Sequence, residues 1–463
     1  MVLLAHSYFM SRDAKQLARH KPYPPLTTLL TAAILREAGH RVEVFDGTFD
    51  EGPESFAQRL AQTVPSVLVL IEDNFNFLTK MCTENRRADA LAMVDMARDK
   101  GWHVAVNSPD AADNPRLYLD AGATAVLTGE GEFAANDFAV SAAFGHAALE
   151  HISGLILDAG QGRVHRTAPR RGRPNLDRLP LPAWDLLDIE SYRAAWAEAH
   201  GRFSLNIAAS RGCPYTCNWC AKPTFGRRYD QRSPSAVAEE MRQLKDRYRP
   251  DHLWFADDIF GMSEKWLRDF ADEVERNDAV IPFTMQSRVN LMSVPVAEAL
   301  QRAGAEEVWL GVETGSQRIL DEMDKGTRVE AARAATRNLK SHGIRACWFL
   351  QLGYPPEDWH DILLTRNLVR EEAPDDIGVS VAYPLPGTAF HERLVADLGP
   401  QRNWQDTDDL AMLFRGAFDT AFYREVRDTL HAETPSGRFD DARWAELGRR
   451  AARHRQAEAK MRA

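Results

Sequence analysis

Three of the chain's five cysteines, Cys213, Cys217 and Cys220, lie within a short stretch of this 463-residue sequence. In S-R-G-C-P-Y-T-C-N-W-C their spacing is C-x3-C-x2-C, which places three thiols on one loop. A structural zinc site generally takes four ligands in paired short spacings, and neither the two remaining cysteines nor a nearby histidine completes such a set. Iron–sulfur clusters are bound by thiolates from short loops. The spacing therefore predicts a [4Fe–4S] cluster with three cysteine ligands and one iron open to an outside ligand.

The composition excludes several other classes of protein. The chain is 44% hydrophobic and 27% charged, which is ordinary for a globular protein. Its net charge of -10 argues against a nucleic-acid or anionic-membrane surface, because phosphate binding needs clustered positive charge. No apolar run approaches the roughly 18 residues of a membrane span. Five cysteines in so long a chain do not form a disulfide framework. We therefore expect a cytoplasmic protein with no membrane span and no nucleic-acid partner.

The elements that must position the cysteines begin with an N-terminal domain, expected at residues 1–144. Strand-like apolar runs alternate there with helical patterns, which predicts an α/β, doubly wound (Rossmann-like) parallel sheet. Ligands of such sheets bind beyond the carboxyl ends of the strands. Strands are expected at residues 1–7, 41–45, 66–71, 103–107 and 125–128.

Three further regions follow. Residues 145–200, rich in Arg, Pro and Gly, are expected to be a connector. Residues 201–400 contain about six strand patterns, each followed by polar or glycine-rich residues, which predicts a partial (β/α)6 barrel with its active site at the C-terminal strand ends. Residues 401–463 are polar and Arg-rich, and a helical C-terminal extension is expected.

From about Ser204 to about Leu394 the sequence resembles the radical S-adenosylmethionine (SAM) superfamily. The resemblance lies in S-R-G-C-P-Y-T-C-N-W-C, F-A-D-D-I-F, S-R-V, G-V-E-T-G-S, L-G-Y-P-P-E-D and P-L-P-G-T. It implies that the open iron binds the amino and carboxylate groups of SAM and that reductive cleavage yields a 5′-deoxyadenosyl radical. An external electron donor such as flavodoxin or ferredoxin would then be required.

The same resemblance assigns the SAM-binding residues. It implies an aromatic contact near the adenine from Trp219, and contacts to the amino group or ribose from paired acids that could equally be helix caps. An arginine would neutralise the SAM carboxylate, since a guanidinium suits bidentate recognition, and a glycine would allow close backbone approach. The set is Trp219, Asp257, Asp258, Arg288, Glu313, Gly315, Ser316 and Gly353.

The N-terminal region resembles the cobalamin-binding domain that precedes many radical SAM barrels. The resemblance lies in residues 24–46, in V-L-T-G-E-G-E and in the connector L-P-L-P-A-W-D. The D-x-H-x-x-G signature, whose histidine ligates cobalt from below, is absent, so the loop at residues 72–77 is expected to meet the lower face. The cobalamin contacts implied are Ser7, Tyr8, Leu26, Glu72, Asp73, Asn74, Phe75, Ser108, Thr128, Gly129, Glu130 and Gly131.

Together these resemblances imply a cobalamin-dependent enzyme that methylates an unactivated carbon of a small-molecule substrate with two SAM molecules. Alternatives are a radical cyclisation, ring contraction or oxidation without methyl transfer, or a non-catalytic cobalamin or iron–sulfur sensor. A sensor would not need the full set of SAM-contacting blocks. The substrate is not identified by the sequence, and its walls are expected among Trp309, Trp348, Tyr354 and Tyr383, each of which could instead pack in the core.

Overall fold

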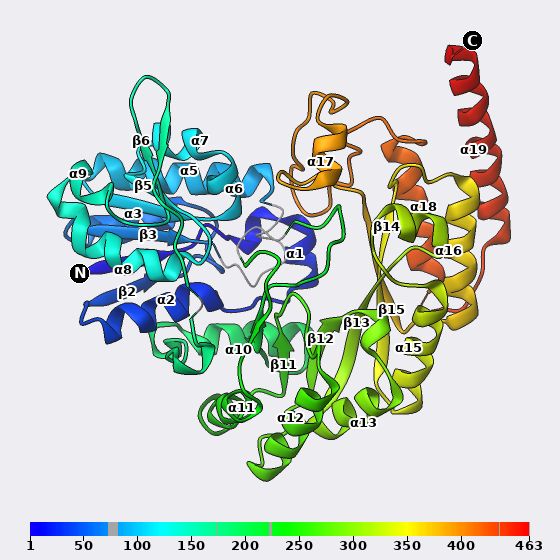
Figure 1. The fold of residues 1–463 in the computed structure, drawn as a ribbon, viewed down its shortest axis with the longest axis horizontal. Helices are drawn as coiled ribbons and strands as arrows, with labels where there is room; N and C mark the ends of the chain where they lie inside the picture. Colours follow the sequence, from blue (N-terminus) through cyan, green and yellow to red (C-terminus); the bar gives the residue numbers. More distant parts are fainter. Residues whose placement is uncertain (73–81, 173, 222–224, 435, 463) are drawn as a thin grey trace.

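The computed structural model describes residues 1–463 except 73–81, 173, 222–224, 435 and 463. For residues 457–462 it describes the backbone only. Two α/β units stand side by side, the first blue to cyan and the second mainly green to yellow (Figure 1). Both sheets are predominantly parallel, so the predicted α/β class is confirmed.

The first unit contains a seven-stranded sheet with the order β2-β1-β3-β4-β5-β6-β7. Its first five strands are parallel, as the alternation of strand and helix patterns predicts. These strands are β1 (Val2–Ala5), β2 (Val42–Phe45), β3 (Val67–Ile71), β4 (His103–Asn107) and β5 (Ala125–Leu127).

Helices cover both faces of this sheet. On one face lie α2 (Leu26–Glu37) and α8 (Gly131–Ser141), and on the other lie α3 (Glu54–Ala61), α5 (Glu84–Asp99) and α7 (Pro115–Ala121). Within β3, Val69 enters the first core, whereas Leu68 and Leu70 enter the second, because successive strand side chains point to opposite faces. A strand buried on both faces must be apolar throughout, which explains the continuous run at 66–71.

The sheet continues beyond the boundary expected at residue 144. The strands β6 (Leu155–Asp158) and β7 (Val164–Arg166) add an antiparallel hairpin to its edge. The first part of the expected connector, 145–200, therefore belongs to the first unit. This hairpin has no helix between its strands, so it breaks the alternating pattern on which the boundary was based. The chain reaches the second unit through α10 (Ile189–His200).

The second unit is an open barrel of six parallel strands with the order β15-β14-β13-β12-β11-β8, as predicted. The strands are β8 (Ser204–Ile207), β11 (His252–Phe255), β12 (Phe283–Ser287), β13 (Ala305–Glu313), β14 (Arg345–Leu352) and β15 (Asp376–Val381). The intervening helices are α11 (Pro234–Tyr248), α12 (Glu264–Arg276), α13 (Val294–Ala303), α14 (Gln317–Glu322), α15 (Val329–Ser341) and α16 (Trp359–Glu372).

The C-terminal extension is helical, with α17 (Ala389–Leu394), α18 (Thr420–Glu433) and α19 (Asp441–Arg462) beyond the last strand (Figure 1). Between α17 and α18 the chain returns to the first unit, where the Thr407 hydroxyl donates to Asp13 Oδ1 at 2.7 Å and the Glu84 amide donates to Trp404 O at 2.8 Å. The extension therefore joins the two units. Among the helices described, none has the length and hydropathy needed to cross a bilayer.

Candidate functional site

The three cysteines lie on a loop that begins at the carboxyl end of β8. A short antiparallel pair, β9 (Ser210–Arg211) and β10 (Asp230–Gln231), closes its base. Gly212 follows β9 with φ +80°, and a Cβ at this position would come within 2.2 Å of Arg228 O. Only glycine allows this approach, so the loop closes directly in front of Cys213.

The three thiols of the loop are all at least partly buried. Cys217 is buried, and Cys213 and Cys220 are partly buried. In the described part of the chain no three cysteine, histidine or acidic side chains converge to hold one metal ion. A [4Fe–4S] cluster needs a different arrangement of ligands, because each thiolate binds a different iron atom and the three sulfurs do not have to converge on one point.

Asn218, between the second and third cysteines, anchors the loop to the barrel. Its amide N–H donates to Met323 O at 3.0 Å, and its carbonyl accepts from the Phe390 amide at 3.0 Å. The Tyr354 hydroxyl donates to Asn218 Oδ1 at 2.6 Å. Tyr354, expected among the substrate walls, therefore supports the cysteine loop. The sequence analysis did not single out Asn218.

Arg288, directly after β12, contacts the cysteine loop. Its Nη1 donates to Cys217 Sγ at 3.4 Å, Nη2 donates to Lys325 O, and the guanidinium lies 3.7 Å from the centre of the Tyr215 ring. The side chain is buried, and its Nε donates to Asn290 Oδ1 at 3.2 Å, so all three guanidinium nitrogens have partners within the protein. Arg288 therefore supports a cysteine ligand, and its contact with a SAM carboxylate stays a prediction.

The cation beside the predicted SAM residues is Lys325, which the sequence analysis missed. Its Nζ donates to Glu313 Oε1 at 2.5 Å, and only 7% of each side chain is exposed. The same Nζ lies 5.9 Å from the centre of the Trp219 ring. Glu313 has φ +67°, a left-handed conformation that is strained for a residue with a Cβ and that concentrates at functional sites. Two predicted SAM residues, Trp219 and Glu313, thus meet around one ammonium group.

The paired acids differ in their surroundings. Asp257 is fully buried, and its carboxylate accepts from the Ser210 hydroxyl and, at 3.1 Å, from the Ala209 amide. Burial raises the pKa of Asp257 to about 7, despite these hydrogen bonds. Asp257 therefore orients the strand end that leads into the cysteine loop, and it does not present an open carboxylate. Asp258 is partly exposed.

Gly315, Ser316 and Gly353 lie in packed contacts. A Cβ on Gly315 would come within 2.5 Å of Leu364 O in α16, and the Ser316 hydroxyl donates to Asp361 Oδ1 in the same helix at 2.6 Å. Gly353 has φ +75° and packs against Met412 of the C-terminal extension. The space next to these residues is filled by protein, so they position the strand ends. The close approach of Gly353 to SAM stays a prediction of the resemblance.

The residues that the sequence analysis expected as substrate walls lie in different environments. Trp309 faces the barrel interior, where it stacks on Phe349 at 4.8 Å between ring centres. Trp348 points outward, and its indole N–H donates to Thr336 in α15 at 3.0 Å. Tyr383 packs on Trp404 of the extension. Trp309 and Phe349, the latter 38% exposed, therefore form one apolar surface, and the role of the four expected residues toward a substrate stays a prediction.

Glu357, four residues after Gly353, is a fully buried carboxyl group whose titration makes a testable prediction. Burial raises its pKa to about 8 from an ordinary value of 4.5. The folded state therefore holds a proton that the unfolded state releases, so stability should fall as pH rises from about 4.5 to about 8. Glu357→Gln retains an acceptor for the Gly353 amide, which now donates to Glu357 Oε1 at 2.6 Å. Urea unfolding at about pH 5 and about pH 9 should show a smaller loss of stability in the variant, and equal losses would contradict the assignment.

At the edge of the first sheet, Ser7 and Glu72 bind each other. The Ser7 amide and hydroxyl donate to Glu72 Oε1 at 3.0 and 2.5 Å, and Arg86 Nε donates to Glu72 Oε2 at 2.7 Å. Burial opposes ionisation of Glu72, but the charge of Arg86 and the Ser7 hydrogen bonds outweigh it and lower the pKa. The Arg86 guanidinium also lies over the Tyr8 ring. Three predicted cobalamin contacts, Ser7, Tyr8 and Glu72, therefore surround one arginine.

The other predicted cobalamin contacts have separate partners. Ser108 caps α6 (Pro109–Asp113), and the Thr128 hydroxyl donates to Gly154 O at 3.0 Å. Gly129 has φ +65°, and a Cβ on Gly131 would come within 2.2 Å of the Asn107 side chain. Leu26 lines a cleft with the connector and the base of the cysteine loop. Asp73, Asn74 and Phe75 lie outside the described residues.

One histidine, His6, lies at this sheet edge directly after β1. Its Nε2 is 2.8 Å from Asp46 Oδ1, and its Nδ1 accepts from the Tyr8 amide at 3.1 Å. Both ring nitrogens are therefore occupied within the protein. This arrangement agrees with the absence of a D-x-H-x-x-G signature.

Comparisons with known proteins agree with this geometry. A family model described as the radical SAM superfamily matches residues 207–369. An uncharacterized methyltransferase of Pyrococcus horikoshii is 27% identical over 82% of this chain and 81% of its own length. The anaerobic magnesium-protoporphyrin IX monomethyl ester cyclase of Rubrivivax gelatinosus is 26% identical over 58% of this chain, which spans about half of that enzyme (49%).

The whole fold also matches a solved structure. The radical SAM methyltransferase TsrM from Kitasatospora setae, determined with cobalamin and a [4Fe–4S] cluster bound, superposes with a TM-score of 0.69. The match covers 85% of this chain and 74% of TsrM at 18% identity, which establishes a shared fold. The barrel at residues 207–369 is therefore similar in sequence to the radical SAM superfamily, and the chain as a whole is similar to methyltransferase-named relatives and shares the fold of TsrM.

Proposed function

We propose that the chain is a cobalamin-dependent radical SAM methyltransferase that methylates an unactivated carbon of a small-molecule substrate and consumes two SAM molecules. The observation that carries the proposal is the position of the cysteine loop. It leaves the carboxyl end of β8 and is bound by side chains from the carboxyl edge of the first sheet. A ligand between two such edges can contact both units.

The donor groups at each position fit the cofactors. Three thiols on one loop, one of them bonded by Arg288, suit a [4Fe–4S] cluster. Trp219 Nε1 is buried and has no hydrogen-bond partner among the described residues, which leaves a donor for a ligand beside Lys325. Arg86 Nη1 is a similar unpaired donor in the described part of the first sheet's edge, and it suits an amide oxygen of a corrin.

When bound, the cluster supplies the electron that cleaves SAM, and the corrin supplies a carrier for a methyl group. The chain's own residues orient these groups and exclude water from them. Lys325 and Glu313 hold charge next to the cysteine loop, Trp309 and Phe349 form an apolar wall inside the barrel, and Thr407 ties the extension to the first unit. The proposed reaction also requires an external one-electron donor such as flavodoxin or ferredoxin. It would take place in the reducing environment of the cytoplasm.

Corrin binding is the first test of this function. Anaerobically purified protein given hydroxocobalamin is expected to retain about one equivalent through desalting. As cob(II)alamin its electron paramagnetic resonance (EPR) spectrum should lack nitrogen superhyperfine splitting, because both nitrogens of His6 are occupied. A clear nitrogen pattern would contradict a histidine-free lower face, and failure to retain any corrin would exclude the methyltransferase.

The second candidate function is a radical cyclisation, favoured by the similarity to the Rubrivivax gelatinosus cyclase. Product analysis separates the two. Formation of S-adenosylhomocysteine beside 5′-deoxyadenosine supports methyl transfer, whereas 5′-deoxyadenosine alone supports cyclisation or another rearrangement. Neither product from protein that holds both cofactors would support a sensor.

A further inference from the structure

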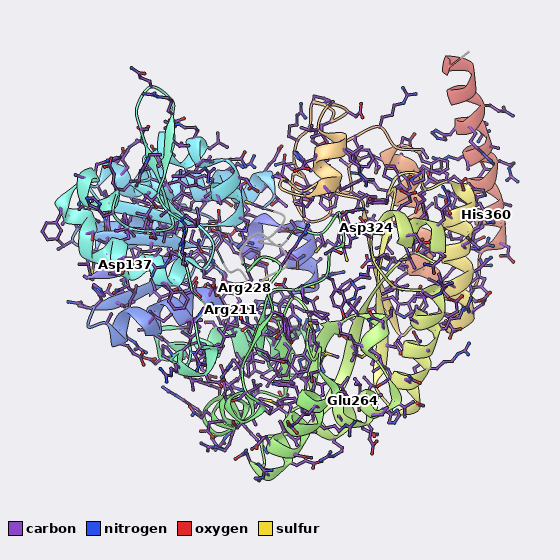
Figure 2. All side chains as sticks on the ribbon, in the orientation of Figure 1. Asp137, Arg211, Arg228, Glu264, Asp324 and His360 are labelled. Carbon is purple, nitrogen blue, oxygen red and sulfur yellow. The ribbon has the colours of Figure 1, made fainter. Side chains whose placement is uncertain are left out.

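Four charged side chains join the turn after β5 to the base of the cysteine loop. Arg211 Nη1 lies 2.5 Å from Glu132 Oε1 and 2.5 Å from Glu130 Oε1, and Arg228 binds the other oxygen of Glu130. Figure 2 shows Arg211 and Arg228 together at the junction of the two units. Two carboxylates of the first unit thus face two guanidinium groups of the barrel, and Arg228 Nε also lies 3.1 Å from Asp230 Oδ2 of β10.

The arginines occupy both ends of the cysteine loop. Arg211 is on β9, two residues before Cys213, and it pairs in register with Asp230 of β10. Arg228 lies two residues before Asp230, and its carbonyl oxygen is the atom that a side chain on Gly212 would strike. Carboxylates from another domain therefore hold the two strands at the base of the loop.

Burial and a fixed backbone restrict the Glu132 carboxylate to its present position. Glu132 lies in the first turn of α8 and is only 1% exposed, and its Oε2 has no hydrogen-bond partner among the described residues. Gly131 packs on Asn107 of β4, which fixes the turn between Glu130 and Glu132. Since a charge this deeply buried needs a partner, Glu132 depends on Arg211.

We propose that Glu130 and Glu132 are positioning residues of the iron–sulfur site, acting across the domain boundary through Arg211 and Arg228. The V-L-T-G-E-G-E turn, which the sequence resemblance assigns to cobalamin, holds the cysteine loop and sets the charge beside the cluster. This inference rests on the proposed cluster. Because net charge and solvent exposure tune the potential of a cluster, the four side chains control how readily it is reduced.

The test uses the two halves of one ion pair in the full-length, reconstituted protein. Glu132→Gln removes one of the two carboxylates that face Arg211 and should shift the cluster's one-electron potential upward. Arg211→Gln removes the cation that faces Glu132 and one of the two cations that face Glu130, and it should shift the potential downward. The double variant should return toward the wild-type value, because the opposing charges are removed together. An EPR-monitored redox titration measures each shift, and iron analysis confirms that the cluster is present.

A matched control removes a buried carboxylate elsewhere. Glu433 in α18 is 3% exposed and binds Arg370 of α16 at 2.8 Å. Glu433→Gln should lower the melting temperature but leave the cluster potential at the wild-type value. If Glu132→Gln does not fold, Glu130→Gln and Arg228→Gln, whose side chains are 11% and 23% exposed, provide the same pair of opposite shifts.

Two outcomes would overturn the inference. One is a shift of the same sign in the glutamate and arginine variants, which would indicate a loosened loop and no charge effect. The other is a cluster potential in the glutamate and arginine variants that equals the potential of the control variant Glu433→Gln. A wild-type protein that takes up no cluster would instead defeat the proposed function, so the two failures are distinguishable.

Discussion

Replacement of Cys213, Cys217 or Cys220 with alanine is expected to abolish cluster assembly and all cleavage of SAM. Each thiolate binds one iron, and a cluster with three protein ligands has no substitute for a lost one. Cys217 should be the most sensitive to its surroundings, since it is buried and accepts from Arg288 Nη1 at 3.4 Å. Iron content and the formation of 5′-deoxyadenosine under dithionite measure both losses.

Two other thiols serve as controls. Cys347, on β14, is completely buried, and burial raises the pKa of its thiol. Cys82 is also buried with a raised pKa, and its backbone oxygen accepts from Asn403 of the extension. Cys347→Ala should cost about 1–2 kcal/mol through a small cavity and leave SAM cleavage intact. A triple alanine variant of the loop that still cleaved SAM would contradict the radical SAM assignment for this site.

Replacement of Lys325 with methionine is expected to lower the free energy of unfolding by about 3–5 kcal/mol, because it leaves Glu313 charged, buried and unpaired. Space around the pair is limited, since a Cβ on Gly311 would come within 2.7 Å of Lys325 Nζ. The variant should also lose SAM binding, because Lys325 is the cation beside Trp219. Urea unfolding and equilibrium binding of SAM measure the two effects separately.

An exposed lysine gives the matched control for this prediction. Lys265 also binds a carboxylate at 2.5 Å, that of Asp269, but its side chain is 83% exposed. Lys265→Met should therefore change stability by less than about 1 kcal/mol. In the double variant Lys325→Met, Glu313→Leu, an apolar pair should recover much of the stability. If SAM binding recovered with it, the role of Lys325 would be structural only.

Local sequence was sufficient for most of the architecture. The apolar run at 66–71 becomes β3, and the six strand patterns after residue 201 become the six strands of the barrel. These predictions succeed because a strand covered on both faces needs a continuous apolar run, and because parallel strands need crossover helices. The hairpin of β6 and β7 was missed because its two strands have no crossover helix between them and the apolar run of β6, residues 155–157, is short.

The sequence by itself determined the cysteine loop, because the spacing of three thiols is a local property of the chain. The partners of the surrounding residues were decided by the tertiary structure. Arg288 binds Cys217, 71 residues away, and Arg211 binds Glu132, 79 residues away. Such pairs form only where the strand ends of distant segments come together in the fold. Periodicity and short motifs are local properties, so they do not predict these pairs. The same physical reason explains why Gly315, predicted to contact SAM, packs on the backbone of α16.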